Sequence, residues 1–322
     1  MVTRRRVVVA LGAGALAPLA SFAQGKKIHR LGILSGTTTS RRDAAFIQAL
    51  GELGYIEGKN ILIERRYPES GADRLPSYAA DLVRLGVDVI FAPNTVAAIA
   101  AKQATAAIPI VFAVAPDPVG SGLVASLSRP GANITGTSSI ATELSAKRLQ
   151  ILKEAFPKIS RVAVFISGER IVNVHLAEVQ RAAKALRIDI LSTQIQHRAE
   201  FEPELAKLRK WRADSVYVIQ SSTNFNNREL LVEFAAKTRL PAIFPYEESV
   251  ELGGLLSYGT SFDALYRRAA TYVDKIIRGA KPVDLPVEQP TIFELVVNKK
   301  TATALGIKFP NSILVRVTKV IE

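Results

Sequence analysis

Short apolar runs alternate with longer stretches in which apolar residues recur every three or four positions. In the first part of the chain, each apolar run ends in proline or in small, turn-forming residues. This pattern predicts buried strands separated by amphipathic helices, and therefore a parallel sheet covered by helices on both faces. The predicted strands are 28–34, 61–66, 87–92 and 108–114, and the predicted helices are 43–53, 74–85 and 96–105.

A second series of the same kind follows residues 128–139, a stretch of small residues that contains a short predicted strand at 133–137. Its predicted strands are 161–167, 188–193, 215–220 and 241–244, and its predicted helices are 143–155, 174–186, 200–211 and 227–238. Beyond these, 253–259 is predicted to be a strand that returns toward the first series, and 262–278 a long amphipathic helix. The tail is predicted to form strands at 291–297 and 313–320 around one short helix.

The order of these elements predicts an α/β protein made of two doubly wound parallel-sheet lobes. About three crossover segments are expected to join the lobes: one near Thr137, one near Tyr258, and one in 282–290, whose prolines exclude a helix. The predicted division is residues 24–137 with 259–281 for lobe 1, and 138–258 with 282–322 for lobe 2. Two lobes joined in this way are expected to enclose a hinged cleft.

The first 23 residues have the pattern of a secretory signal peptide rather than of a folded element. Arg4, Arg5 and Arg6 precede an apolar run of about 14 residues, which is shorter than the roughly 20 needed to span a bilayer. Cleavage is expected after Ala23, and the mature protein is expected in the periplasm. The pattern leaves open whether export uses the general or the twin-arginine route.

Composition narrows the possible partners. The chain has 322 residues, no cysteine and a net charge of +13, so thiolate metal sites, cysteine nucleophiles and a lipid-modified cysteine are excluded. The basic residues are scattered along the chain, which is typical of solvated helix faces, and no nucleic-acid partner is expected. No later apolar run is long enough to span a membrane, so stable membrane insertion is not expected either.

In open parallel sheets, ligands bind beyond the carboxyl ends of the strands, where loops from several strands meet. This rule selects polar residues of both lobes and of the crossing between them. The predicted ligand-binding residues are Ser35, Gly36, Asn94, Thr95, Asp117, Thr137, Ser138, Ser139, Ser167, Ser221, Asn224, Tyr246 and Glu247.

The chemistry of this set fits a small, polar, hydrogen-bonding molecule such as a zwitterion. Hydroxyl groups and helix amino termini can hold a carboxylate, and Asp117 or Glu247 can receive an ammonium group. Each residue also has a purely structural alternative. Asn94 can simply cap the following helix, Asp117 can cap a turn, and Tyr246 can be a half-buried surface aromatic rather than a stacking partner.

Signatures of catalysis and of metal binding are missing from the sequence. No phosphate-binding loop and no nucleophile elbow is present, and the histidines at 29, 175 and 197 do not have the spacing of metal ligands. The chain is therefore not expected to be an enzyme, and neither a cofactor nor a metal is expected.

Several stretches resemble the ABC transporter substrate-binding family that includes the TrpX-type tryptophan-binding proteins, a branch of the type I periplasmic binding fold. The similar stretches are 51–69 (GELGYIEGKNILIERRYPE), 115–139 (APDPVGSGLVASLSRPGANITGTSS), 253–259 (GGLLSYG) and 269–306, and the likeness covers the whole predicted mature chain. The resemblance implies a periplasmic receptor that closes its interlobe cleft on a solute and presents it to an ABC transporter permease.

The resemblance favours an amino acid as the ligand, with an aromatic or branched side chain. The positive net charge leaves open an anionic or aromatic acid instead. Two other classes remain as alternatives: a sensory module that signals to a membrane receptor, and an exported α/β hydrolase. The hydrolase would need a nucleophile and base pair that the sequence does not display.

Overall fold

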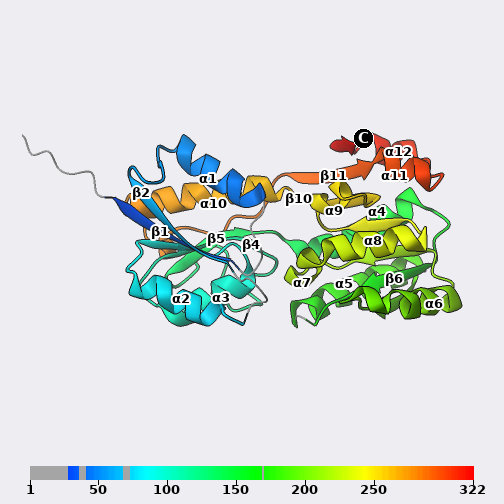
Figure 1. Cartoon of the computed structure of the whole chain (residues 1–322), viewed down its shortest axis with the longest axis horizontal. Coiled ribbons are helices and arrows are strands. Elements are labelled where there is room, and N and C mark those ends of the chain that lie inside the picture. The colour runs from blue at the N-terminus through cyan, green and yellow to red at the C-terminus, as the bar shows by residue number, and fades with distance from the viewer. Residues whose placement is uncertain (1–27, 36–40, 68–72, 169) are drawn as a thin grey trace, which may run out of the picture.

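The computed structural model describes residues 28–35, 41–67, 73–168 and 170–322. They form two α/β lobes that lie side by side along the longest axis of the molecule (Figure 1). The predicted signal peptide at 1–23 and the candidate Gly36 lie outside the described residues. Within these residues, no helix is both long enough and apolar enough to cross a bilayer.

Lobe 1 is built on a five-stranded parallel sheet with the strand order β2-β1-β3-β4-β5. Its strands are β1 (His29–Leu34), β2 (Ile61–Arg66), β3 (Val89–Phe91), β4 (Ile110–Ala115) and β5 (Ile134–Ser138). Its helices are α1 (Arg41–Glu52), α2 (Leu75–Arg84), α3 (Thr95–Ala104) and the late helix α10 (Phe262–Ile277). Helices α1 and α10 cover one face of the sheet, and α2 and α3 cover the other (Figure 1).

Burial on both faces explains why the strands of this lobe are nearly continuous apolar runs. In β1, Leu31 and Ile33 pack with Phe46 of α1 and Tyr272 of α10, whereas Leu34 packs on the side of α2 and α3. Successive side chains of a strand point to opposite faces, so each face receives its own set. Each sheet face thus has a separate apolar core.

Lobe 2 is built on a seven-stranded sheet with the order β12-β11-β10-β9-β8-β6-β7. Its strands are β6 (Arg161–Phe165), β7 (Asp189–Thr193), β8 (Ser215–Val218), β9 (Ala242–Phe244), β10 (Leu256–Thr260), β11 (Phe293–Asn298) and β12 (Lys319–Ile321). Its longer helices are α4 (Ala141–Ala155), α5 (Arg170–Leu186), α6 (Phe201–Trp211) and α8 (Arg228–Thr238), of which α6 follows the 3-10 turn η1 (Arg198–Glu200). One pair, β10 with β11, is antiparallel, so the sheet is not purely parallel.

Shorter elements differ most from the sequence prediction. Helices α7 (Ser222–Asn226) and α9 (Glu247–Glu251) were not expected. The strand predicted at 313–320 is wrong over most of its length: α11 (Lys299–Ala304) is followed by a second short helix, α12 (Asn311–Leu314), and only β12 pairs with β11. Val315 is 81% exposed, so its β-branched side chain gave a strand signal without a buried face behind it.

Three segments cross between the lobes, as the sequence predicted. The first joins β5 to α4, the second joins β10 to α10, and the third joins the 3-10 turn η2 (Pro282–Asp284) to β11. The third segment stays with lobe 1 for longer than the sequence division at 281/282 suggested. Val287 belongs to the core of lobe 1, and the backbone of Glu288 is hydrogen-bonded to β5. The chain therefore passes to lobe 2 only after Glu288.

Candidate functional site

A cavity of about 480 Å³ lies between the lobes and is lined by residues of both. Strands β3 and β4 of lobe 1 and strands β8 and β9 of lobe 2 lead to it at their carboxyl ends. That is the position expected for a ligand in open α/β sheets. The volume falls within the range of small-molecule sites, about 300–1,000 Å³.

The lobe 1 wall includes the amino terminus of α3. Asn94 is its N-cap, and its side-chain oxygen accepts a 3.0 Å hydrogen bond from the backbone N–H of Ala97. The next residue, Thr95, also lines the cavity, and its buried hydroxyl oxygen has no hydrogen-bond partner among the described residues. The buried hydroxyl of Ser121, on the same wall, has none there either. These two hydroxyls remain available to a polar ligand.

Asp117 lines the cavity from the turn that follows β4. Its Oδ1 accepts a 2.8 Å hydrogen bond from the backbone N–H of Gly120, so the turn-capping alternative is realised in the structure. An added Cβ at Gly120 would lie 2.0 Å from Asp117 Oδ2, so a larger residue would displace the carboxylate. The carboxylate is thus held in one orientation at the cavity wall.

The lobe 2 wall contains the polar residues that follow β8. Ser221 caps α7 by accepting a 3.0 Å hydrogen bond from the N–H of Asn224, and Ser167 donates to the Ser221 hydroxyl at 3.0 Å. Asn224 points away from the cavity, with its Nδ2 2.8 Å from the carbonyl oxygen of Ile219. Ser221 therefore lines the cavity, whereas Ser167 and Asn224 support it from behind.

Three aromatic side chains form an apolar wall that spans both lobes. Phe225 and Tyr246 belong to lobe 2, and Phe262 begins α10 of lobe 1. The ring centroid of Tyr246 is 5.1 Å from that of Phe225 and 5.7 Å from that of Phe262. The Tyr246 hydroxyl donates a 2.8 Å hydrogen bond to the carbonyl oxygen of Ser221, which fixes the ring. Tyr246 is 5% exposed, so it is a wall residue and not a surface aromatic.

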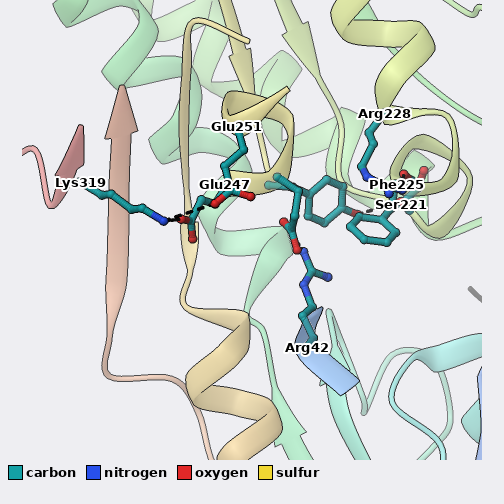
Figure 2. Close-up of polar contacts among 9 residues, drawn as sticks. Arg42, Ser221, Phe225, Arg228, Glu247, Glu251 and Lys319 are labelled. Atoms are coloured by element: carbon teal, nitrogen blue, oxygen red, sulfur yellow. Dashed lines mark hydrogen bonds and ion pairs between the residues drawn. The ribbon is translucent and has the colours of Figure 1, made fainter. Parts of the chain in front are cut away.

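Arg42 of α1 crosses from lobe 1 into this aromatic group (Figure 2). Its guanidinium carbon lies 4.5 Å from the ring centroid of Phe225 and 4.3 Å from that of Phe262, within cation–π range. Its Nη2 donates a 2.6 Å hydrogen bond to Glu248 of α9, and both side chains are largely buried. Arg42 Nε is buried without a partner in the described part of the chain.

The remaining predicted residues lie outside the cavity. Ser35 is buried at the end of β1. The side chains of Thr137 and Ser138 donate to the backbone of β4, and the carbonyl oxygen of Ser139 accepts a 2.9 Å hydrogen bond from Thr260. Thr137 and Ser138 thus hold β5 against β4 within lobe 1, and Ser139 connects this crossing to β10 of lobe 2. Glu247 forms an ion pair with Lys319 (Figure 2) and lines a second, much smaller pocket.

Much of the cavity wall was not among the residues selected from the sequence, including Arg42, Gln220, Phe225 and Phe262. Gln220 lies two residues after the end of β8, whereas the strand predicted at 215–220 included it, so only the residues after it were selected. Arg42 had no such signal, because a basic residue in an amphipathic helix is normally solvated. Phe262 looked like an ordinary apolar residue at the start of a helix.

The charged groups at the cavity wall are few. Arg42 and Asp117 are the ionisable residues of opposite sign that line it, and Arg42 is already paired with Glu248. Burial raises the pKa of Tyr266 far above its ordinary value, so this wall residue remains a neutral phenol. The part of the chain that the structure describes contains no cluster of three metal-ligating side chains.

Two α/β lobes with three crossings and a cavity between them define a two-lobed solute-binding protein, and the fold is that of the type I periplasmic binding proteins. Residues 27–321 match the family model described as ABC transporter substrate binding protein. The chain therefore belongs to that family, whose members bind small solutes outside the cytoplasm and work with an ABC transporter.

Comparisons with individual proteins agree with this family membership. The chain is 27% identical over 287 residues to a tyrosine-binding protein of Clostridioides difficile (strain R20291), covering 88% of this chain and 82% of that one. A conserved domain protein of Vibrio cholerae has a similar structure, with a TM-score of 0.82, 26% identity and coverage of 91% and 100%. An ABC domain from Streptococcus pneumonia in complex with L-Trp gives a TM-score of 0.81 at 24% identity, with coverage of 91% and 99%.

Proposed function

We propose that this protein is the periplasmic solute-binding component of an ABC importer and that its ligand is an amino acid with an aromatic or branched side chain. The observation that carries the proposal is the composition of the interlobe cavity. The same cavity is lined by an aromatic wall, by the fixed carboxylate of Asp117, and by the hydroxyls of Thr95 and Ser121, which have no partner among the described residues. A zwitterion with an apolar side chain matches all three features.

The apolar part of the ligand packs on Phe225, Tyr246 and Phe262 in this proposal, because rings prefer offset or edge contacts with other rings. The ammonium group binds Asp117, whose Oδ1 is held by the turn. The hydroxyls of Thr95 and Ser121 bind remaining polar atoms of the solute. The relatives support this choice, since one is a tyrosine-binding protein and another was solved with L-Trp.

The arrangement of the two lobes supports the closed conformation of such a binding protein rather than the open one. The chain superposes with a TM-score of 0.81 on the complex with L-Trp, but of 0.68 on the ligand-free, open form of a Clostridium difficile substrate-binding protein, at similar identity. The ion pair between Arg42 and Glu248 connects the two lobes in this arrangement. Closure on the solute, with hinge changes at the three crossings, presents it to the permease of the transporter.

The remaining parts of the proposal follow from the class of protein. Export is directed by the signal peptide at 1–23, with cleavage after Ala23. The protein binds its solute without transforming it, in keeping with the substrate-binding relatives and with the missing nucleophile and base pair.

Isothermal titration of the mature protein tests the ligand class. The panel is L-tyrosine, L-tryptophan, L-leucine, the deaminated acid hydroxyphenylpropionate, and glucose. We expect saturable one-to-one binding of an amino acid, recovery of the unchanged compound after prolonged incubation, and no binding of glucose. Tight binding of hydroxyphenylpropionate with no binding of any amino acid would instead favour an aromatic acid as the ligand. Chemical conversion of the bound compound would contradict the non-enzymatic role.

A further inference from the structure

Beneath the lobe 2 wall of the cavity, Arg148 of α4 is completely buried. Its Nε donates a 2.6 Å hydrogen bond to the carbonyl oxygen of Tyr258, and its Nη2 donates a 2.9 Å hydrogen bond to Oε1 of Gln220. Its Nη1 is buried with no partner among the described residues. Arg148 forms no ion pair with any carboxylate in the described part of the chain. A positive charge is thus buried beside a residue of the cavity wall, and no described carboxylate balances it.

The contact with Arg148 determines which way the Gln220 amide faces. An arginine side chain has only donors, so the group that contacts it must be the amide oxygen. The Nε2 group of Gln220 therefore turns away from Arg148, and within the described structure it makes a single, long hydrogen bond of 3.4 Å to the Ser139 hydroxyl. Gln220 lines the cavity. Its N–H groups are consequently offered to an acceptor on the cavity side.

We infer that Gln220, oriented by Arg148, receives the carboxylate of the ligand, and that the unpaired charge of Arg148 favours an anionic group at this end of the cavity. The inference rests on the proposed function and names the subsite for one end of the zwitterion. Buried charges interact strongly because the surrounding medium screens them poorly. A ligand carboxylate beside Gln220 supplies the counter-charge that Arg148 lacks among the described residues. Asp117 in lobe 1 and Gln220 in lobe 2 then bind opposite ends of one solute, and so connect closure to occupancy.

Gln220→Glu tests the inference because it is nearly isosteric. The new carboxylate pairs with Arg148, removes the N–H donors and repels a ligand carboxylate. We expect the affinity for the acid to fall at least about tenfold, and the affinity for the matching amide to change much less. The titrations use L-tyrosine, L-tryptophan and L-leucine, each with its amide. Thermal unfolding of the variant is expected to be no easier than that of the wild type, since Arg148 gains a partner.

Gln103→Glu, on the exposed face of α3, is the matched control for the change in net charge. Arg148→Met is expected to lower the preference for acid over amide, and Arg148→Lys to restore part of it. If the role of Arg148 is purely structural, Arg148→Met lowers the affinity for the acid and for the amide equally. Should Arg148→Met fail to fold, Gln220→Glu decides alone.

An unchanged preference for acid over amide in Gln220→Glu overturns the inference while leaving the proposed function intact. A wild-type protein that binds hydroxyphenylpropionate but no amino acid overturns the proposed function. In that case the loss of this acid in Gln220→Glu still supports the inference. Preference of the wild-type protein for the amides, or failure to bind any of these acids, overturns the inference about Gln220.

Discussion

Arg42 and Glu248 are 206 positions apart in the sequence, yet Nη2 of Arg42 donates a 2.6 Å hydrogen bond to Oε2 of Glu248 across the cleft. The guanidinium lies against Phe225 of lobe 2 and Phe262 at the second crossing. Because one partner belongs to each lobe, the ion pair exists only when the lobes are together. It therefore stabilises the closed state relative to the open state.

Replacing Arg42 by Met is expected to weaken ligand binding about tenfold or more, because a hydrogen bond to a charged group contributes about 1.5–3 kcal/mol. Small-angle scattering of the ligand-free variant is expected to give a larger radius of gyration than the wild type. The control is Arg198→Met, which removes an exposed ion pair with Glu233 inside lobe 2. Equal affinities of Arg42→Met and the wild type would exclude a role of the pair in closure.

Asp117 and Glu247 are both acidic residues selected from the sequence as ammonium partners, but only Asp117 lines the interlobe cavity. Asp117→Asn keeps an oxygen for the Gly120 N–H and removes the charge, so amino-acid affinity is expected to fall by about 1.5–3 kcal/mol in binding free energy. Glu247→Gln is the matched variant and is expected to bind normally. Titration calorimetry measures the affinity of both variants. Weaker binding by Glu247→Gln than by Asp117→Asn would place the ammonium site at Glu247.

The buried side chain of His175 is expected to make the stability of the folded protein sensitive to acid. Ser145 donates its hydroxyl proton to the carbonyl oxygen of Ala141, so His175 must donate from Nδ1 to the Ser145 oxygen. Its Nε2 is then unprotonated, buried and without a partner in the described structure. Burial, and secondarily the charge of Arg148, lower the pKa of His175 to about 4. A proton on Nε2 is therefore strongly disfavoured in the folded state.

The unfolded chain binds a proton at His175 near pH 6.5, whereas the folded chain does so only near pH 4. Stability from the neutral ring is thus present above pH 6.5 and is lost as the pH falls toward 4. Between pH 7 and pH 5 the free energy of unfolding is expected to drop by about 2 kcal/mol from this group. Urea denaturation measures this drop in the free energy of unfolding. His175→Asn is expected to make the free energy of unfolding depend less on pH, and the variant His197→Asn, at an exposed histidine, serves as the control. An unchanged pH dependence in His175→Asn would contradict the assignment of this effect to His175.

Gly136 of β5 lies against the backbone of β4, where the register between the two strands shifts. A Cβ added there would lie 2.0 Å from the carbonyl oxygen of Phe112, which no side-chain rotation can relieve. Gly136→Ala is therefore expected to reduce stability by roughly 3 kcal/mol or more. Gly51→Ala in α1 meets nothing within 4 Å and is expected to stabilise by about 0.5–1 kcal/mol. Thermal unfolding of the two variants tests this difference in stability. Equal unfolding midpoints for Gly136→Ala and Gly51→Ala would refute it.

The sequence alone was enough to predict two α/β lobes and most of their strands and helices. Leu31, Ile33 and Leu34 are buried within their own lobe, and burial within a lobe leaves a periodic signal along the chain. The same reasoning brought Asn94, Asp117 and Ser221 to one cavity, because they follow strands whose carboxyl ends lie at the cleft.

Tertiary structure alone decided the rest of the cavity wall. Arg42 and Phe262 enter it because the lobes meet there, and no local pattern records a contact between residues some 200 positions apart. The antiparallel pairing of β11 with β10 likewise depends on where the third crossing returns. Periodicity reports which face of an element is buried, but not which distant element covers it.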